Sequence, residues 1–183
     1  MKGIAYTRKI NGENFSFLHN ADVENGTFVF KGDLVAGETQ IYNALIPTTA
    51  TLKQKAYLVN DPAWSYDTSK SVNQNRENYV NVAGTAFRGY DINTTNKFDV
   101  SVYTIDGVVE VGNYVTLQNG NGRLIAGTAA PASATYGLIG KIERFYEKGH
   151  FSPIDAGGDV DAALGYGLDG RIRYAVIEVI QNG

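Results

Sequence analysis

The decapeptide RIRYAVIEVI, residues 171–180, indicates the fold class of this 183-residue chain most directly. Successive side chains of a strand point to opposite faces, so every second residue of the stretch shares a face. Both faces are apolar: Ile172, Tyr174 and Val176 on one side, Ala175, Ile177 and Val179 on the other. A strand that is apolar on both sides lies inside a sheet or carries a bulge. The stretch therefore predicts a central or bulged strand in a β-rich protein.

Shorter strand-like runs recur upstream, and turn residues separate them. The clearest pair, residues 114–117 and 123–126, is joined by Asn-Gly-Asn-Gly at 119–122, which predicts a β-hairpin. No long 3.6-residue periodicity is present, so little helix is expected. Other such runs are residues 27–30, 55–59, 98–102 and 138–145. The predicted fold class is mainly β, as a β-barrel or a β-sandwich.

The domain organisation has two readings. A chain of 183 residues forms one domain or two small ones. The similar hexapeptides PTTATL (47–52) and PASATY (131–136) are compatible with two related β modules, although such a short match of common residue types also arises by chance. We then expect an N-terminal docking arm over residues 1–20, a first module over 21–105 and a second over 106–183. A single β domain is the alternative.

Composition excludes several classes of function. The chain has no cysteine, so disulfides, zinc–thiolate sites and thiol catalysis are excluded. A net charge of −3 argues against a nucleic-acid-binding surface and against binding to an anionic membrane. The first 17 residues have no signal-peptide pattern, and no apolar run approaches 18 residues. We expect neither nucleic acid nor a membrane as a partner.

The hexapeptide GYGLDG, residues 165–170, has the glycine spacing of a dinucleotide-binding loop. Such a loop needs a strand before it and a helix after it, so that the helix N-terminus meets the pyrophosphate. Here a strand-like run follows the glycines, and Asp159–Leu164 before them reads as a short helix. Gly165, Gly167 and Gly170 are therefore interpreted as turn residues, and no cofactor is expected.

No residue pattern indicates catalysis or a metal site. His19 and His150 lack a second ligand at helical or strand spacing, and edge or loop positions are the simpler interpretation. Asp155, Asp159 and Asp161 lack the spacing of a calcium-binding loop, so they indicate a solvated acidic loop. The chain is expected not to be an enzyme and to have no catalytic and no metal-binding residues.

Four aromatic residues are candidate interface positions. Trp64 and Tyr66, in DPAWSYD (61–67), suit a protein-interface anchor or a sugar-stacking platform. A half-buried aromatic residue that pins a loop to the body is the structural alternative for Trp64. Phe15 and Phe17, within the expected arm, complete the candidate interface.

Several segments together resemble a protein family. They are ENGTFVFKGDLV (24–35), AYLVNDPAWSYD (56–67), NYVNVAG (78–84), VGNYVTL (111–117) and IEVI (177–180). They are similar to small structural proteins of tailed phages that are encoded beside the major capsid protein, and the similarity spans about residues 20–183. The resemblance implies a β-rich decoration or cement protein without catalytic residues. It also implies that the protein is made in the cytoplasm of a host bacterium and resides in the virion.

Two non-enzymatic functions therefore follow as expectations. The first is a virion structural protein that binds and stabilises a phage capsid, with the major capsid protein and a second copy of the chain as partners. The alternative is a carbohydrate- or receptor-binding β module of a phage particle. An exposed aromatic row in a groove would favour the sugar binder, and a large flat patch or an ordered arm would favour the capsid protein. A third, weaker alternative is a hydrolase whose site leaves no sequence signature.

Overall fold

The protein is built from two packed β layers in a computed structural model that describes residues 3–10, 12–62, 79–149 and 171–183. Strands dominate it, and the helical content of the described residues is one short 3₁₀ turn, η3 (Val102–Thr104). The prediction of a mainly β protein with little helix is confirmed. No helix in these ranges is long and apolar enough to cross a membrane.

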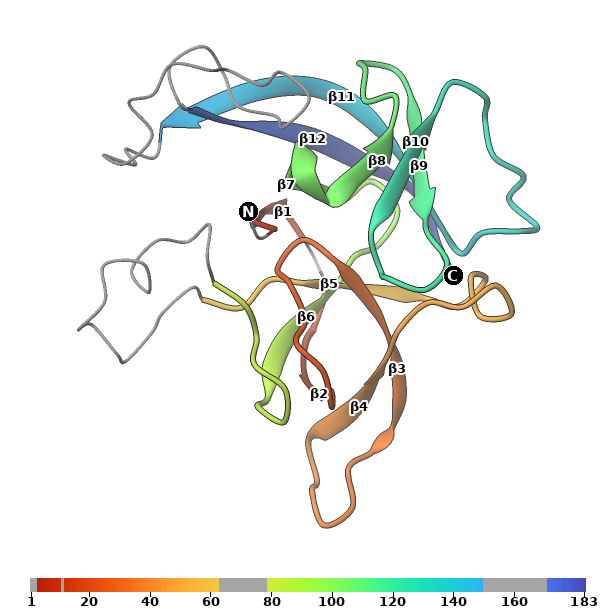
Figure 1. Cartoon of the computed structure of the whole chain (residues 1–183). Helices are drawn as coiled ribbons and strands as arrows, with labels where there is room; N and C mark the ends of the chain where they lie inside the picture. Colours follow the sequence, from red (N-terminus) through yellow and green to blue (C-terminus); the bar gives the residue numbers. More distant parts are fainter. Residues whose placement is uncertain (1–2, 11, 63–78, 150–170) are drawn as a thin grey trace.

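The first layer is a closed five-stranded barrel, the lower part of Figure 1. Its neighbours run in the order β2-β4-β3-β5-β6, and β6 pairs back with β2. The β2–β4 pair is parallel, and the other pairs are antiparallel. The strands are β2 (Asn14–Leu18), β3 (Phe28–Leu34), β4 (Ile41–Leu45), β5 (Ala56–Val59) and β6 (Phe87–Asp91).

The second layer is a seven-stranded sheet in the order β1-β7-β12-β11-β9-β10-β8. Its longest members, β11 and β12, form the hairpin at the top of Figure 1. The hairpin β9–β10 confirms the turn predicted at 119–122, where Gly120 and Gly122 have positive φ angles. The strands are β1 (Ala5–Lys9), β7 (Lys97–Ser101), β8 (Ile105–Gly107), β9 (Tyr114–Leu117), β10 (Leu124–Gly127), β11 (Leu138–Gly149) and β12 (Arg171–Asn182).

Strand β12 has both features predicted for residues 171–180. It lies between β7 and β11, and its pairing with β11 shifts register twice, between Ile139 and Gly140 and between Ile142 and Arg144. The apolar residues of both its faces, named above, are almost completely buried. A strand that buries both faces needs cover on each side, and the barrel supplies it on one side.

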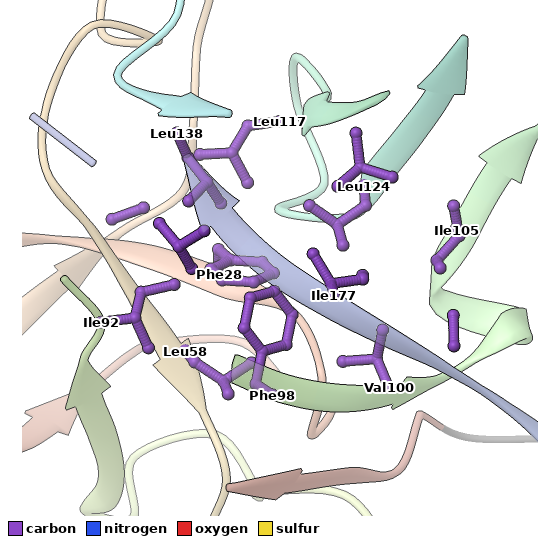
Figure 2. Close-up of a cluster of buried hydrophobic side chains, with 14 of the residues drawn as sticks. Phe28, Leu58, Ile92, Phe98, Val100, Ile105, Leu117, Leu124, Leu138 and Ile177 are labelled. Carbon is purple, nitrogen blue, oxygen red and sulfur yellow. The ribbon is translucent and has the colours of Figure 1, made fainter. Parts of the chain in front are cut away.

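The two layers share one core, because β3 and β5 bury both of their faces. Phe28 and Leu58 point toward the sheet, where the Phe28 ring meets Phe98 edge-on at 5.6 Å between centroids. The alternate residues Val29 and Val59 fill the barrel interior. Figure 2 shows the shared cluster. Ile177 of β12 lies beside the Phe98 ring, and Leu58 lies lower in the view.

The domain boundaries differ from those predicted. Residues 5–9 form an edge strand paired with β7, and residues 14–18 belong to the barrel, so residues 1–20 are no separate arm. Burial of Ile4 and Phe17 explains why this segment joins the body. The barrel uses residues 14–91, and the sheet combines residues 5–9 with 97–182. A division between residues 105 and 106 would split the sheet, and the shared core makes the two layers one packed unit.

Candidate functional site

The four predicted interface residues have different positions. Trp64 and Tyr66 lie outside the described residues. Phe17 is a core residue and not an interface residue, since it is 0% exposed and packs inside the barrel on Tyr57 and Phe87. Gly89 on the neighbouring strand makes room for this ring, because a Cβ there would lie 2.5 Å from it. Phe15, two residues earlier on the same strand face, is half-buried at the barrel end.

A cation caps the aromatic cluster at this barrel end. The Lys31 ammonium lies 3.8 Å from the ring centroid of Tyr42 and 4.2 Å from that of Phe15. Phe15 also meets Tyr57 edge-on at 5.3 Å. Burial raises the pKa of Tyr57, and the nearby Asp91 carboxylate raises it further. Because Lys31 already lies over the rings of Phe15 and Tyr42, these ring faces are not available to the cation of a ligand.

A polar depression of about 720 Å³ lies beside Lys31. It forms where β3 bulges, since Gly32 and Asp33 together oppose Asn43 of β4. Its polar lining is His19, Asn20, Lys31, Asp33, Asn43 and Gln54. These side chains offer both hydrogen-bond donors and acceptors, so the depression suits a ligand rich in hydroxyl or amide groups.

A second candidate surface is the side of the seven-stranded sheet that faces away from the barrel. Opposed residues of antiparallel strands point to the same face. One row therefore runs Arg144, Val176, Asp99 and Tyr6 across β11, β12, β7 and β1. The next row runs Tyr146, Tyr174 and Ser101. The side of these four strands that carries the two rows is called the outer sheet face.

A buried carboxylate ties three strands of the outer sheet face together. The Asp99 side chain is 2% exposed, and the Arg8 Nε donates to its two oxygens at 2.5 and 2.7 Å. The Tyr146 hydroxyl donates to the same carboxylate at 2.6 Å. The hydrogen bond to Asp99 raises the pKa of Arg8, while burial and then the same carboxylate raise the pKa of Tyr146. Pairing compensates the cost of burying this charge.

Tyrosines and cations are stacked around that carboxylate. Tyr146 stacks on Tyr174 at 5.3 Å with 17° between the ring planes, and Tyr6 lies 5.4 Å from Tyr174. The Lys148 ammonium lies 4.2 Å from the Tyr6 centroid, and the Arg8 guanidinium 5.0 Å from that of Tyr146. We call these five residues the tyrosine–cation cluster. Packing on the fully buried Tyr174 holds the half-buried rings of Tyr6 and Tyr146 in place, so this part of the surface is rigid.

The outer sheet face has a positive charge excess within an acidic protein. It carries six cationic and three acidic side chains, a net charge of +3, while the whole chain carries −3. Asp99 pairs with Arg8, and Glu143 and Glu178 pair with Lys97. The hydrogen bond from Lys97 lowers the pKa of Glu143. Within the described ranges no salt bridge neutralises the other four cations: Lys9, Lys141, Arg144 and Lys148.

Sequence reasoning missed this surface, although a signal for it exists. Tyr6 and Arg8 alternate on β1, and Arg144, Tyr146 and Lys148 alternate on β11. Aromatic and basic residues at every second position place both kinds on one strand face. The pattern is short in each strand, and only the pairing of β1, β7, β12 and β11 brings the two segments together.

No metal site is found in the part of the chain that the structure describes, where no group of three His, Cys, Asp or Glu side chains is close enough to hold an ion. The His19 ring contacts the backbone of Ala21 at 3.1 Å. The other residues considered for metal or nucleotide binding lie outside the described ranges: His150, Asp155, Asp159, Asp161, Gly165, Gly167 and Gly170.

Comparison with known proteins identifies no relative: no family model, no curated protein and no solved structure matches this chain. The two surfaces just described, the barrel depression and the outer sheet face, are therefore the basis for inferring function.

Proposed function

We propose that this protein is a non-enzymatic virion structural protein that binds a phage capsid and stabilises it. The observation that carries the proposal is the outer sheet face, a rigid surface on which tyrosines and positive charge are concentrated. A sheet face that spreads over four strands suits a large partner better than a small molecule. The resemblance to capsid-associated phage proteins supports the same function.

The composition of the surface favours binding to a protein. Tyrosine and arginine are enriched among the residues that contribute most to protein–protein binding. The side chains of the tyrosine–cation cluster are already held by one another, so little conformational entropy is lost on association. A protein that binds the assembled shell lowers the free energy of that state, which stabilises the capsid by mass action.

The edges of the seven-stranded sheet favour docking through its face. The edge strand β1 exposes Arg8 and Lys9, and the other edge strand, β8, has three residues. Charged or very short edge strands disfavour the addition of a strand from another chain. A partner is therefore expected to lie across the face of the sheet.

The polar depression on the barrel supports a second candidate function, a carbohydrate-binding module of the phage particle. Its volume of about 720 Å³ and its amide, imidazole and carboxylate groups suit the hydroxyl groups of a sugar. In the described residues the aromatic rings next to it, Phe15 and Tyr42, already hold Lys31. Among the described residues the depression therefore has no open ring on which a sugar could stack, and capsid binding is the first proposal.

The experiment mixes the purified protein with capsids that lack it and measures co-sedimentation and heat resistance. We expect saturable binding at micromolar concentration or below, and a higher temperature of capsid disruption. Absence of capsid binding, together with glycan binding that Asn43→Ala removes, would move the function to the second candidate. Lys53→Glu, an exposed change outside both surfaces, is the control for non-specific effects of charge.

A further inference from the structure

We infer that the outer sheet face docks through Arg144, Lys148 and Lys9 onto an acidic protein surface of the assembled capsid. This inference rests on the proposed function and adds to it the docking face and the chemistry of the partner. The three cations are exposed, and within the described ranges none has an acidic partner at salt-bridge distance. A carboxylate on a partner would supply the missing opposite charge.

The three cations are spread over the area of a docking surface. Lys148 is opposite Ile172, Arg144 is opposite Val176, and Lys9 is in the row of Lys97 and Glu178. The rows from Lys148 to Lys9 therefore span about 20 Å along the strands, at a rise of about 3.3 Å per residue. The rings of Tyr6, Tyr146 and Tyr174 lie between the outermost rows. A surface of this kind, with rigid aromatic residues between cations, is typical of a protein interface.

The contacts of the tyrosines favour a protein partner over a nucleic acid. Single-stranded nucleic acids bind by stacking their bases on open aromatic rings. Here Tyr174 is fully buried, Tyr146 stacks on it and lies beside Arg8, and Tyr6 lies beneath Lys148. The rest of the chain, with a net charge of −6 when the +3 of this face is taken from the total of −3, would also repel a polyphosphate.

A second copy of the chain is a weaker occupant, because four of the six acidic side chains described within residues 14–91 of its barrel are engaged. Asp91 pairs with Lys55, and Asp61 accepts hydrogen bonds from Tyr79 and from the Arg88 backbone. Asp22 accepts one from the Ala83 backbone. Carboxylates already used in this way are poor partners for further cations, so the described part of a second copy's barrel offers few free carboxylates to this face.

The test compares capsid binding by the wild-type protein, by Arg144→Glu/Lys148→Glu and by the matched control Lys53→Glu. Both substituted cations of the double variant are exposed and lack salt bridges among the described residues, so its unfolding transition should stay close to that of the wild type. We expect capsid affinity to fall roughly 10- to 100-fold in the double variant and to stay within about twofold in the control. Wild-type affinity should also fall as salt rises from 50 to 300 mM.

The outcomes separate this inference from the proposed function. Equal capsid binding by the wild type and the double variant overturns the docking face and leaves the proposed function standing. No binding of the wild type to capsids overturns the proposed function itself. Sedimentation velocity measures self-association, and oligonucleotide titration measures DNA binding. If either is sensitive to salt, is as tight as capsid binding and is abolished in the double variant, the outer sheet face is assigned to a second copy or to nucleic acid instead.

Discussion

The barrel end and the outer sheet face use the same pairing of cations with aromatic rings, with different results. At the barrel end Lys31 lies over Phe15 and Tyr42, inside a closed ring of strands. On the outer sheet face Lys148 lies over Tyr6, and Arg8 lies over Tyr146. Closure of the barrel buries its inner side chains, whereas the outer sheet face keeps its cations exposed to a partner above the buried Ile172, Tyr174 and Val176. The same contact therefore stabilises the fold in one place and prepares a surface in the other.

The largest expected effect comes from the core that joins the two regions. Phe98→Ala removes a fully buried ring that packs edge-on against Phe28, so unfolding free energy should fall by about 3–5 kcal/mol. Urea denaturation should show the loss as one transition by both near- and far-ultraviolet circular dichroism. Phe17→Ala, inside the barrel alone, should cost a similar amount.

The exposed change Val108→Ala is the control for that pair and should stay within about 0.5 kcal/mol of the wild type. Two separate transitions in Phe98→Ala would contradict the view that barrel and sheet form one cooperative unit.

The next effect is a dependence of stability on alkaline pH, at Tyr79 beside Asp61 and at Tyr146 on the outer sheet face. Burial, followed by the Asp61 carboxylate, raises the pKa of Tyr79 from 10.0 to about 12, and burial and Asp99 raise that of Tyr146. A raised pKa means that the folded state keeps its proton while the unfolded state loses it. The stabilisation is therefore complete below pH 10 and declines as pH rises through the folded-state pKa.

Tyr79→Phe and Tyr146→Phe should each make the loss of stability above pH 10 less steep, as measured by thermal unfolding between pH 8 and 12. Tyr42→Phe is the matched comparison for the loss of a phenol. A wild-type curve that is flat over this range would show that neither hydroxyl is protected from ionisation.

The smallest expected effects on stability come from Lys31 and Lys148, one cation from each region. Lys31→Met should reduce stability by about 1 kcal/mol, because Lys31 contacts two rings, and should leave capsid binding unchanged. Lys148→Met should cost about 0.5 kcal/mol of stability at its exposed site and weaken capsid binding. Thermal unfolding and co-sedimentation on the same samples give both values. The reverse pattern would exchange the roles of the two regions.

Local sequence chemistry was reliable for strands and turns and unreliable for pairing. The turn at 119–122 formed the expected hairpin because its two strands are neighbours in the chain. Asn25-Gly26 has the same turn signature, and Gly26 does have a φ of +81°, yet β2 and β3 do not pair. Instead the buried Asn25 amide bonds the backbone of Asp61. A turn signature sets local dihedral angles, while pairing depends on which distant strand buries the apolar face.

The sequence by itself determined the mainly β class, the central position of residues 171–180 and the low helix content, because side-chain alternation and turn residues act within a few positions. Only the tertiary structure decided that β1 joins β7 across 91 residues, from Arg8 to Asp99, and that Phe17 is core. It also brought Tyr6, Tyr146 and Tyr174 onto one face. Contacts between distant segments depend on the burial of whole strands against one another, and no short stretch of sequence records which partner each strand finds.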